Sequence, residues 1–292
     1  MAEADGTPRI ADETTVGPVH LTVADLDRSL AYYTDSIGLQ VLARDGSRAE
    51  LGAGGETLLV LYEEPGAEPV HGHTGLFHFA VLLPDRLDLA RWLAHAAQSH
   101  VPLSGASDHL VSEALYLRDP DGHGIEIYRD RPRAEWPRDG EGVRMATLPL
   151  DLDAILGSLD EPRTSYPGMP AGARMGHVHL HVRDVDEAER FYGDVLGFDL
   201  MAHLGDQATF LSAGGYHHHV GGNTWAGHGA SPPPPDSAAL RYATIVLPDA
   251  EERDRVADRV RASGQEPEPF DGGVMVRDPS QNAWLLTTPA AT

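Results

Sequence analysis

The chain has 292 residues, a formal net charge of −23 and no cysteine. This length allows two domains with separate cores, and the lack of cysteine excludes disulfides and thiolate sites, so any metal must be held by nitrogen and oxygen. The negative charge disfavours nucleic-acid binding, and since neither a long apolar run nor a secretory leader is present, we expect a cytoplasmic protein without a membrane partner.

The chain repeats itself after a polar, acidic start, residues 1–15, that we expect to be disordered. Residues 16–39 align without a gap to residues 175–198. Each copy predicts a strand, an aspartate that caps a helix (Asp25 or Asp184), an amphipathic helix and a glycine just after it. Further strands are expected to follow each helix.

A second pair of segments is also repeated, because residues 75–85 resemble residues 239–249. Helices are predicted after them at about 86–99 and 250–263, followed by strands. The fold class is therefore α+β, with four βαβββ modules at 16–64, 73–130, 174–222 and 238–288. We divide the chain into a first domain, 16–130, a proline-rich linker, 131–173, with a short helix near 151–159, and a second domain, 174–288.

Residues 107–128 predict a strand, a tight turn at Asp119–Gly122 and a second strand that carries a glutamate inward. In the second strand, Ile125 and Ile127 share one face and Glu126 lies on the other. A carboxylate within an apolar strand is costly to bury unless it is paired or binds a metal.

The first strand of each module is expected to pack one face on the helix. Histidines recur on the other face of these strands. The inward positions of three modules hold His20, His78, His177, His179 and His181. The fourth module has Tyr242 and Leu285 where the second has His78 and Glu126, so its ligand set is empty. One inward histidine is usually a hydrogen-bonded core residue, but the recurrence beside an inward glutamate favours a metal site. Two histidines and one carboxylate suit Fe(II) or Mn(II), and do not exclude Zn(II).

The repeated modules resemble the vicinal oxygen chelate (glyoxalase/bleomycin resistance/extradiol dioxygenase) superfamily, whose modules pair into open, metal-lined barrels. The run from His109 through L-Y-L-R-D-P-D-G-H-G-I-E to Glu126 is similar to the signature of the extradiol dioxygenases, in particular catechol 2,3-dioxygenases. Only Ser107 departs from it. The resemblance covers about 16–288 and implies two such barrels, His78 and Glu126 as metal ligands, and His109 and Tyr116 as groups that touch the substrate oxygens.

The third ligand depends on which modules pair. If the first and second pair, it is His20; if the second and third pair, it is His179. The second pairing also brings in the run 216–220, Y-H-H-H-V, near the position where family members have an acid/base histidine, so we favour it. The register within His217, His218 and His219 is open, and we predict His218 as the acid/base.

The resemblance implies an Fe(II)-dependent extradiol dioxygenase of aromatic hydrocarbon catabolism that opens a catechol with O2 to a muconic semialdehyde. Two alternatives stay open: a metal isomerase of the glyoxalase I type with four protein ligands, and a metal-free small-molecule binding or resistance protein. The implied partners are a small aromatic diol and O2. The ring substituents, the choice between Fe(II) and Mn(II), and association into a homo-oligomer are not fixed by the sequence.

Overall fold

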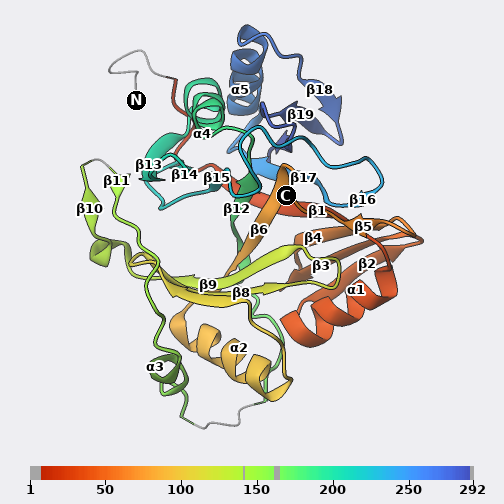
Figure 1. The fold of residues 1–292 in the computed structure, drawn as a ribbon, viewed down its shortest axis with the longest axis vertical. Coiled ribbons are helices and arrows are strands. Elements are labelled where there is room, and N and C mark those ends of the chain that lie inside the picture. The colour runs from red at the N-terminus through yellow and green to blue at the C-terminus, as the bar shows by residue number, and fades with distance from the viewer. Residues whose placement is uncertain (1–7, 141, 161–164, 290–292) are drawn as a thin grey trace.

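Two mixed eight-stranded sheets form the molecule (Figure 1), seen in a computed structural model that describes residues 8–140, 142–160 and 165–289. The first sheet contains, in spatial order, β18 (Glu268–Phe270), β19 (Gly273–Arg277), β20 (Ala283–Thr287), β17 (Leu240–Val246), β1 (Thr15–Val23), β4 (Glu56–Glu63), β3 (Arg48–Ala53) and β2 (Gln40–Asp45). The second contains β13 (Asp199–Leu204), β14 (Ala208–Ser212), β15 (Val220–Asn223), β12 (Arg174–His181), β6 (Gly75–Leu82), β9 (Gly124–Asp130), β8 (Ser112–Arg118) and β7 (Gly105–Asp108).

Helices lie in all four modules, as predicted, whereas the linker helix is shorter than the expected 151–159 and a 3-10 turn in the linker was not predicted. The helices are α1 (Leu26–Tyr32) continued by the π-helix η1 (Tyr33–Ile37), α2 (Arg86–Gln98), the 3-10 turn η2 (Arg133–Glu135), α3 (Leu152–Leu156), α4 (Val185–Glu189) continued by the π-helix η3 (Arg190–Leu196), and α5 (Ala250–Ala262). The side chains of Asp25 and Asp184 accept hydrogen bonds from backbone N–H groups of the first turn. Gly38 and Gly197 end the helices of the two copies with φ angles of 90° and 94°, a conformation that glycine adopts without steric cost.

The two sheets show how the modules pair. In the second sheet, β6 of the second module lies antiparallel to β12 of the third, as we favoured. In the first sheet, β1 of the first module lies antiparallel to β17 of the fourth. Each sheet therefore combines strands from both sides of the linker, and the pairing crosses the division between 16–130 and 174–288.

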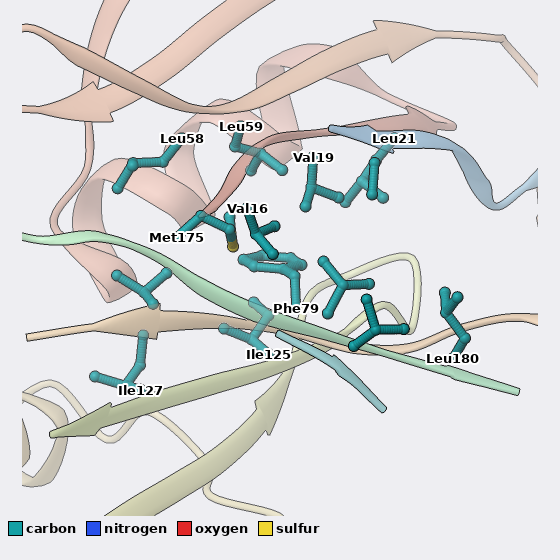
Figure 2. Close-up of a cluster of buried hydrophobic side chains, with 14 of the residues drawn as sticks. Val16, Val19, Leu21, Leu58, Leu59, Phe79, Ile125, Ile127, Met175 and Leu180 are labelled. Carbon is teal, nitrogen blue, oxygen red and sulfur yellow. The ribbon is translucent and has the colours of Figure 1, made fainter. Parts of the chain in front are cut away.

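The packing faces of both sheets meet in one hydrophobic core (Figure 2). Val19 and Leu21 of β1 point from the first sheet toward Phe79 of β6 and Leu180 of β12 from the second. All four side chains are at most 1% exposed. The alternation of the strands turns the residues between them to the opposite, concave faces, which leaves those faces available for polar groups.

Two segments outside the modules are more ordered than the sequence suggested. Residues 8–14, which we expected to be disordered with 1–7, pack on the third module: Ile10 is buried and its N–H donates to the carbonyl of Gly197. Residues 1–7 lie outside the described residues. The linker contains a small hairpin, β10 (Arg138–Asp139) and β11 (Gly142–Val143), and a further short pair joins β5 (Glu68–Pro69) to β16 (Ser237–Ala238). None of the helices in the described ranges combines the length and apolarity that crossing a membrane needs.

Candidate metal centre

Three side chains converge on the concave face of the second sheet: His78, Glu126 and His177. Oε2 of Glu126 lies 3.0 Å from Nε2 of His78 and 3.0 Å from Nε2 of His177. The two Nε2 atoms are 3.3 Å apart. Among the described residues, this is the one histidine and carboxylate group found whose ligand atoms all lie close enough to hold an ion, and all three members are buried.

The strand register explains why His177, and not His179, joins the group. His177 pairs with Ala80 of β6, and Ala80 pairs with Glu126 of β9, so His177 and Glu126 lie in one row across the sheet. His179 pairs with His78 in the next row, and its Nε2 has no hydrogen-bond partner among the described residues. We therefore replace His179 with His177 as the proposed third ligand. The sequence placed both on the same face, and strand alternation alone cannot separate them.

Two members of the group, Glu126 and His177, carry the charges that metal binding requires. Burial by itself would raise the pKa of Glu126, but the neighbouring imidazoles of His177 and His78 hold that pKa well below its ordinary value. Burial lowers the pKa of His177 to about 4, against the opposing effect of Glu126. At neutral pH the group therefore offers a carboxylate and a neutral His177 imidazole, the protonation states in which these side chains ligate cations.

The spacing of the group fits a divalent ion. For ligand bonds of about 2.1 Å, neighbouring donors are about 3.0 Å apart in an octahedron and about 3.4 Å apart in a tetrahedron. The observed separations of 3.0 Å and 3.3 Å lie within this range. The Nδ1 atoms of His78 and His177 are buried without a hydrogen-bond partner in the described part of the chain, so the Nε2 atoms are the ones that converge. Two imidazoles and one carboxylate form the facial set that leaves coordination positions open.

A cavity of about 630 Å³ opens above the group. It is lined by the central strands of the second sheet, by residues 142–147 of the linker and by β13. The linker hairpin is held there by a small apolar cluster with Val143, Met201 and Trp136 at its centre. This part of the lining was not predicted, because a proline-rich linker carries no periodic signal for a cover over a distant sheet.

His109 and Tyr116 lie together in this cavity. Nδ1 of His109 is 2.7 Å from the carbonyl oxygen of Ala146, which can only accept, so Nδ1 carries the proton. Nε2 of His109 is then the acceptor for the hydroxyl of Tyr116, 2.6 Å away. Burial and the charge of Glu126 raise the pKa of Tyr116 well above its ordinary value, so the phenol stays protonated.

Of the three consecutive histidines, only His218 lines the cavity. Nε2 of His217 is 2.9 Å from Asp130 and donates to it, so Nδ1 of His217 accepts from Nδ1 of His218 at 2.8 Å. His218 is thereby left with an unprotonated Nε2. Burial and the surrounding histidines lower its pKa well below its ordinary value, which keeps the ring neutral. Nδ1 of His219 instead accepts a hydrogen bond from the backbone N–H of Ala213.

Asp130 was missed as a contributor to the site, and no pattern in the sequence pointed to it. His20, the alternative third ligand, lies in the other sheet, where its ring stacks on Tyr242 with centroids 3.9 Å apart. Its Nδ1 is 3.1 Å from the hydroxyl of Tyr62. His20 is therefore part of an aromatic cluster and not of the metal group.

The second sheet is a half-barrel of paired βαβββ modules, which is the vicinal oxygen chelate fold. Its buried group of two histidines and one carboxylate is a metal-binding site of the kind that metalloproteins have. The chain belongs to the Glyoxalase/Bleomycin resistance protein/Dioxygenase superfamily, whose family model matches residues 15–127 and 174–286. Both matched ranges fall on the repeated modules, so the family assignment rests on the same elements as the fold.

The known proteins that are similar to this chain include an enzyme, and this similarity extends over nearly the whole length of both chains. The chain is 47% identical over 282 residues to catechol-2,3-dioxygenase of Bacillus subtilis (strain 168), a match that covers 94% of this chain and 98% of the relative. The crystal structure of a putative dioxygenase from Bacillus subtilis subsp. subtilis str. 168 has a TM-score of 0.66 at 13% identity, covering 97% of this chain and 87% of that one. Glyoxalase I from Zea mays has a TM-score of 0.56 at 18% identity, covering 94% and 92%. At these identities the two structures show a shared fold alone.

Proposed function

We propose that the protein is an extradiol dioxygenase that uses Fe(II) and O2 to open a catechol to a muconic semialdehyde. The observation that carries the proposal is that the two-histidine, one-carboxylate group shares one cavity with His109, Tyr116 and His218. This donor set is the one that binds Fe(II) and leaves positions free for substrate and oxygen. The identity to the Bacillus subtilis catechol-2,3-dioxygenase supports the same class of reaction.

His78, Glu126 and His177 would hold the ion, and Mn(II) suits the same donors. When bound, Fe(II) would bring both catechol oxygens and dioxygen to one centre, which removes much of the entropic cost of a reaction among three bodies.

His218 is proposed to take a proton from the catechol and return it during ring cleavage. Its unprotonated Nε2 is the acceptor, and its Nδ1 proton stays in the hydrogen bond to His217. The carboxylate of Asp130 at the end of this chain favours the positive charge that His218 gains when it accepts the proton.

Tyr116 and His109 are proposed to bind the oxygens of the ring. The hydroxyl of Tyr116 donates to His109, so its oxygen can accept a hydrogen bond from a catechol hydroxyl. Because the pKa of Tyr116 is raised, the phenol keeps its proton, and a hydroxyl that turns from His109 toward the substrate would donate to an oxygen that becomes negatively charged.

The proposal is tested by anaerobic reconstitution with Fe(II), followed by catechols of several kinds and air. We expect stoichiometric oxygen uptake and a yellow product with absorbance in the near-visible, and a parallel sample with Mn(II) compares the two ions. If every catechol leaves the oxygen concentration and the absorbance unchanged, the proposal is wrong.

Two further measurements distinguish the alternative functions from the proposed one. A glyoxalase I-type isomerase needs no oxygen, so turnover of a ketoaldehyde and thiol adduct under nitrogen would favour it. A metal-free binding protein would retain no Fe(II) or Mn(II) after gel filtration. The buried converging group argues for retention, because three such side chains would otherwise be costly to bury together.

A further inference from the structure

We propose that the preferred substrate is a catechol that carries a bulky apolar substituent, such as an alkyl chain or a second aromatic ring. The subsite that receives this substituent is formed by Trp225, Leu200 and Leu204 at the mouth of the cavity. This inference rests on the proposed function, since it concerns the part of the same cavity that lies beyond the metal group.

The cavity is too large for a bare benzenediol. A closed apolar cavity of about 150 Å³ is enough to bind benzene, and cavities of about 300 to 1,000 Å³ hold ligands of drug size. The cavity here measures about 630 Å³. A catechol bound at His78, Glu126 and His177 would therefore leave most of it unfilled.

The remaining space has an aromatic wall beside the metal group. Phe77 contacts Trp225 edge to face at 5.0 Å between ring centroids, and His179 lies 5.7 Å from Trp225 and 5.5 Å from Phe210. Aromatic faces of this kind suit a planar or aliphatic group rather than a charged one.

The mouth of the cavity exposes large apolar side chains that a monomeric protein would normally cover. Leu200, Leu204 and Trp225 are 43%, 51% and 46% exposed. They are three of the six large hydrophobic residues exposed in the described ranges, and all three line this one cavity. Exposed apolar groups that cluster at a single opening mark a binding surface, and an apolar substituent would cover them.

Charge at the opening does not favour an anionic substituent. The linker places Arg144 and Asp139 on the same wall, so the positive and negative charges offset each other there. The net charge of −23 on the whole chain also opposes the approach of a carboxylate. A neutral apolar substituent avoids both effects.

The experiment compares kcat/KM for catechol, 3- and 4-phenylcatechol, and 3,4-dihydroxyphenylacetate with the Fe(II)-loaded protein. We expect at least one phenylcatechol to exceed catechol by tenfold or more. The variant Trp225→Ala should reduce the ratio of phenylcatechol to catechol at least fivefold. The variant Phe270→Ala removes an equally exposed aromatic side chain from β18 in the other sheet and should leave this ratio unchanged.

Two results would overturn the inference while leaving the proposed function intact: catechol or the carboxylate compound being the best substrate, or Trp225→Ala leaving the ratio unchanged. Calorimetric binding to the metal-free protein gives a readout that does not need turnover. Tighter binding of phenylcatechol than of catechol, weakened at least fivefold by Trp225→Ala, supports the subsite, and equal binding of the two compounds contradicts it. Absence of turnover with every compound counts against the proposed function instead.

Discussion

The two sheets of this molecule are built alike, but among the described residues only the second sheet carries a histidine and carboxylate group that could hold a metal ion. His177, His78 and Glu126 of the second sheet correspond by repeat and strand register to Pro18, Tyr242 and Leu285 of the first. The first sheet fills its concave face with rings, of which His20 and Tyr242 are stacked. The comparison teaches that the scaffold tolerates the loss of its ligands, because the concave residues do not pack in the core.

The scaffold itself is repeated in detail. Tyr33 of the first module donates to Asp119 at 2.9 Å, and Tyr192 of the third donates to Asp278 at 2.9 Å. Each aspartate also accepts backbone N–H groups of its own turn, Asp119 in one sheet and Asp278 in the other. These contacts join modules of different sheets, and both copies make them whether or not a metal site is present.

The largest effect is expected from Glu126→Gln. The amide has nearly the same shape but no charge, so it should abolish retention of iron while the chain stays folded, as measured by metal content and by circular dichroism. The matched variant Leu285→Met changes the corresponding position of the other sheet and should leave the metal content unchanged. If the Glu126→Gln variant still retains one iron ion per chain, the metal binds at another site and the prediction is wrong.

A second pair of variants distinguishes the two neighbouring histidines of β12. His177→Gln should lose the metal, because it removes one of three converging donors, whereas His179→Gln should keep it. Metal content after dialysis is the measurement. The reverse outcome would restore His179 as the third ligand and contradict the row assignment drawn from the strand register.

His218→Gln should keep the metal and lower kcat by about 10²- to 10⁴-fold, the usual contribution of a positioned acid/base group. The expected cause is loss of the Nε2 acceptor, since the glutamine amide is not basic. His228→Gln alters an exposed histidine away from the cavity and serves as the control. A kcat within twofold of the unmodified protein would remove His218 from the mechanism.

The smallest effect concerns His20 in the sheet without a metal group. Burial and the nearby Arg48 and Arg241 lower its pKa from 6.5 to about 3 in the folded state. The unfolded chain therefore binds the proton more tightly, and stability falls as the pH drops below about 6.5. Relative to His20→Phe, the free energy of unfolding should decrease by up to about 2 kcal/mol between pH 7 and pH 5. Denaturant titrations at both pH values check this, and a difference that does not vary with pH would contradict it.

Local patterns predicted much of the fold. The capping aspartates, the helices and the glycines after them follow from residues within one turn of each other, which is why Asp25 and Asp184 were placed correctly. The preferred pairing of the second and third modules was also right, because only that pairing gathered enough histidines on one face. The order in residues 8–14 was missed, because the contact of Ile10 with Gly197 joins segments far apart in sequence.

Taken alone, the sequence determined that four modules exist, that His78 and Glu126 turn away from the packing face, and that the fourth module lacks their counterparts, because strand alternation and helix capping are short-range effects. Only the tertiary structure decided which histidine of β12 meets Glu126 and which residues cover the cavity. Those outcomes depend on the register between strands of different modules and on the path of the linker, and both are set by long-range packing that no local pattern records.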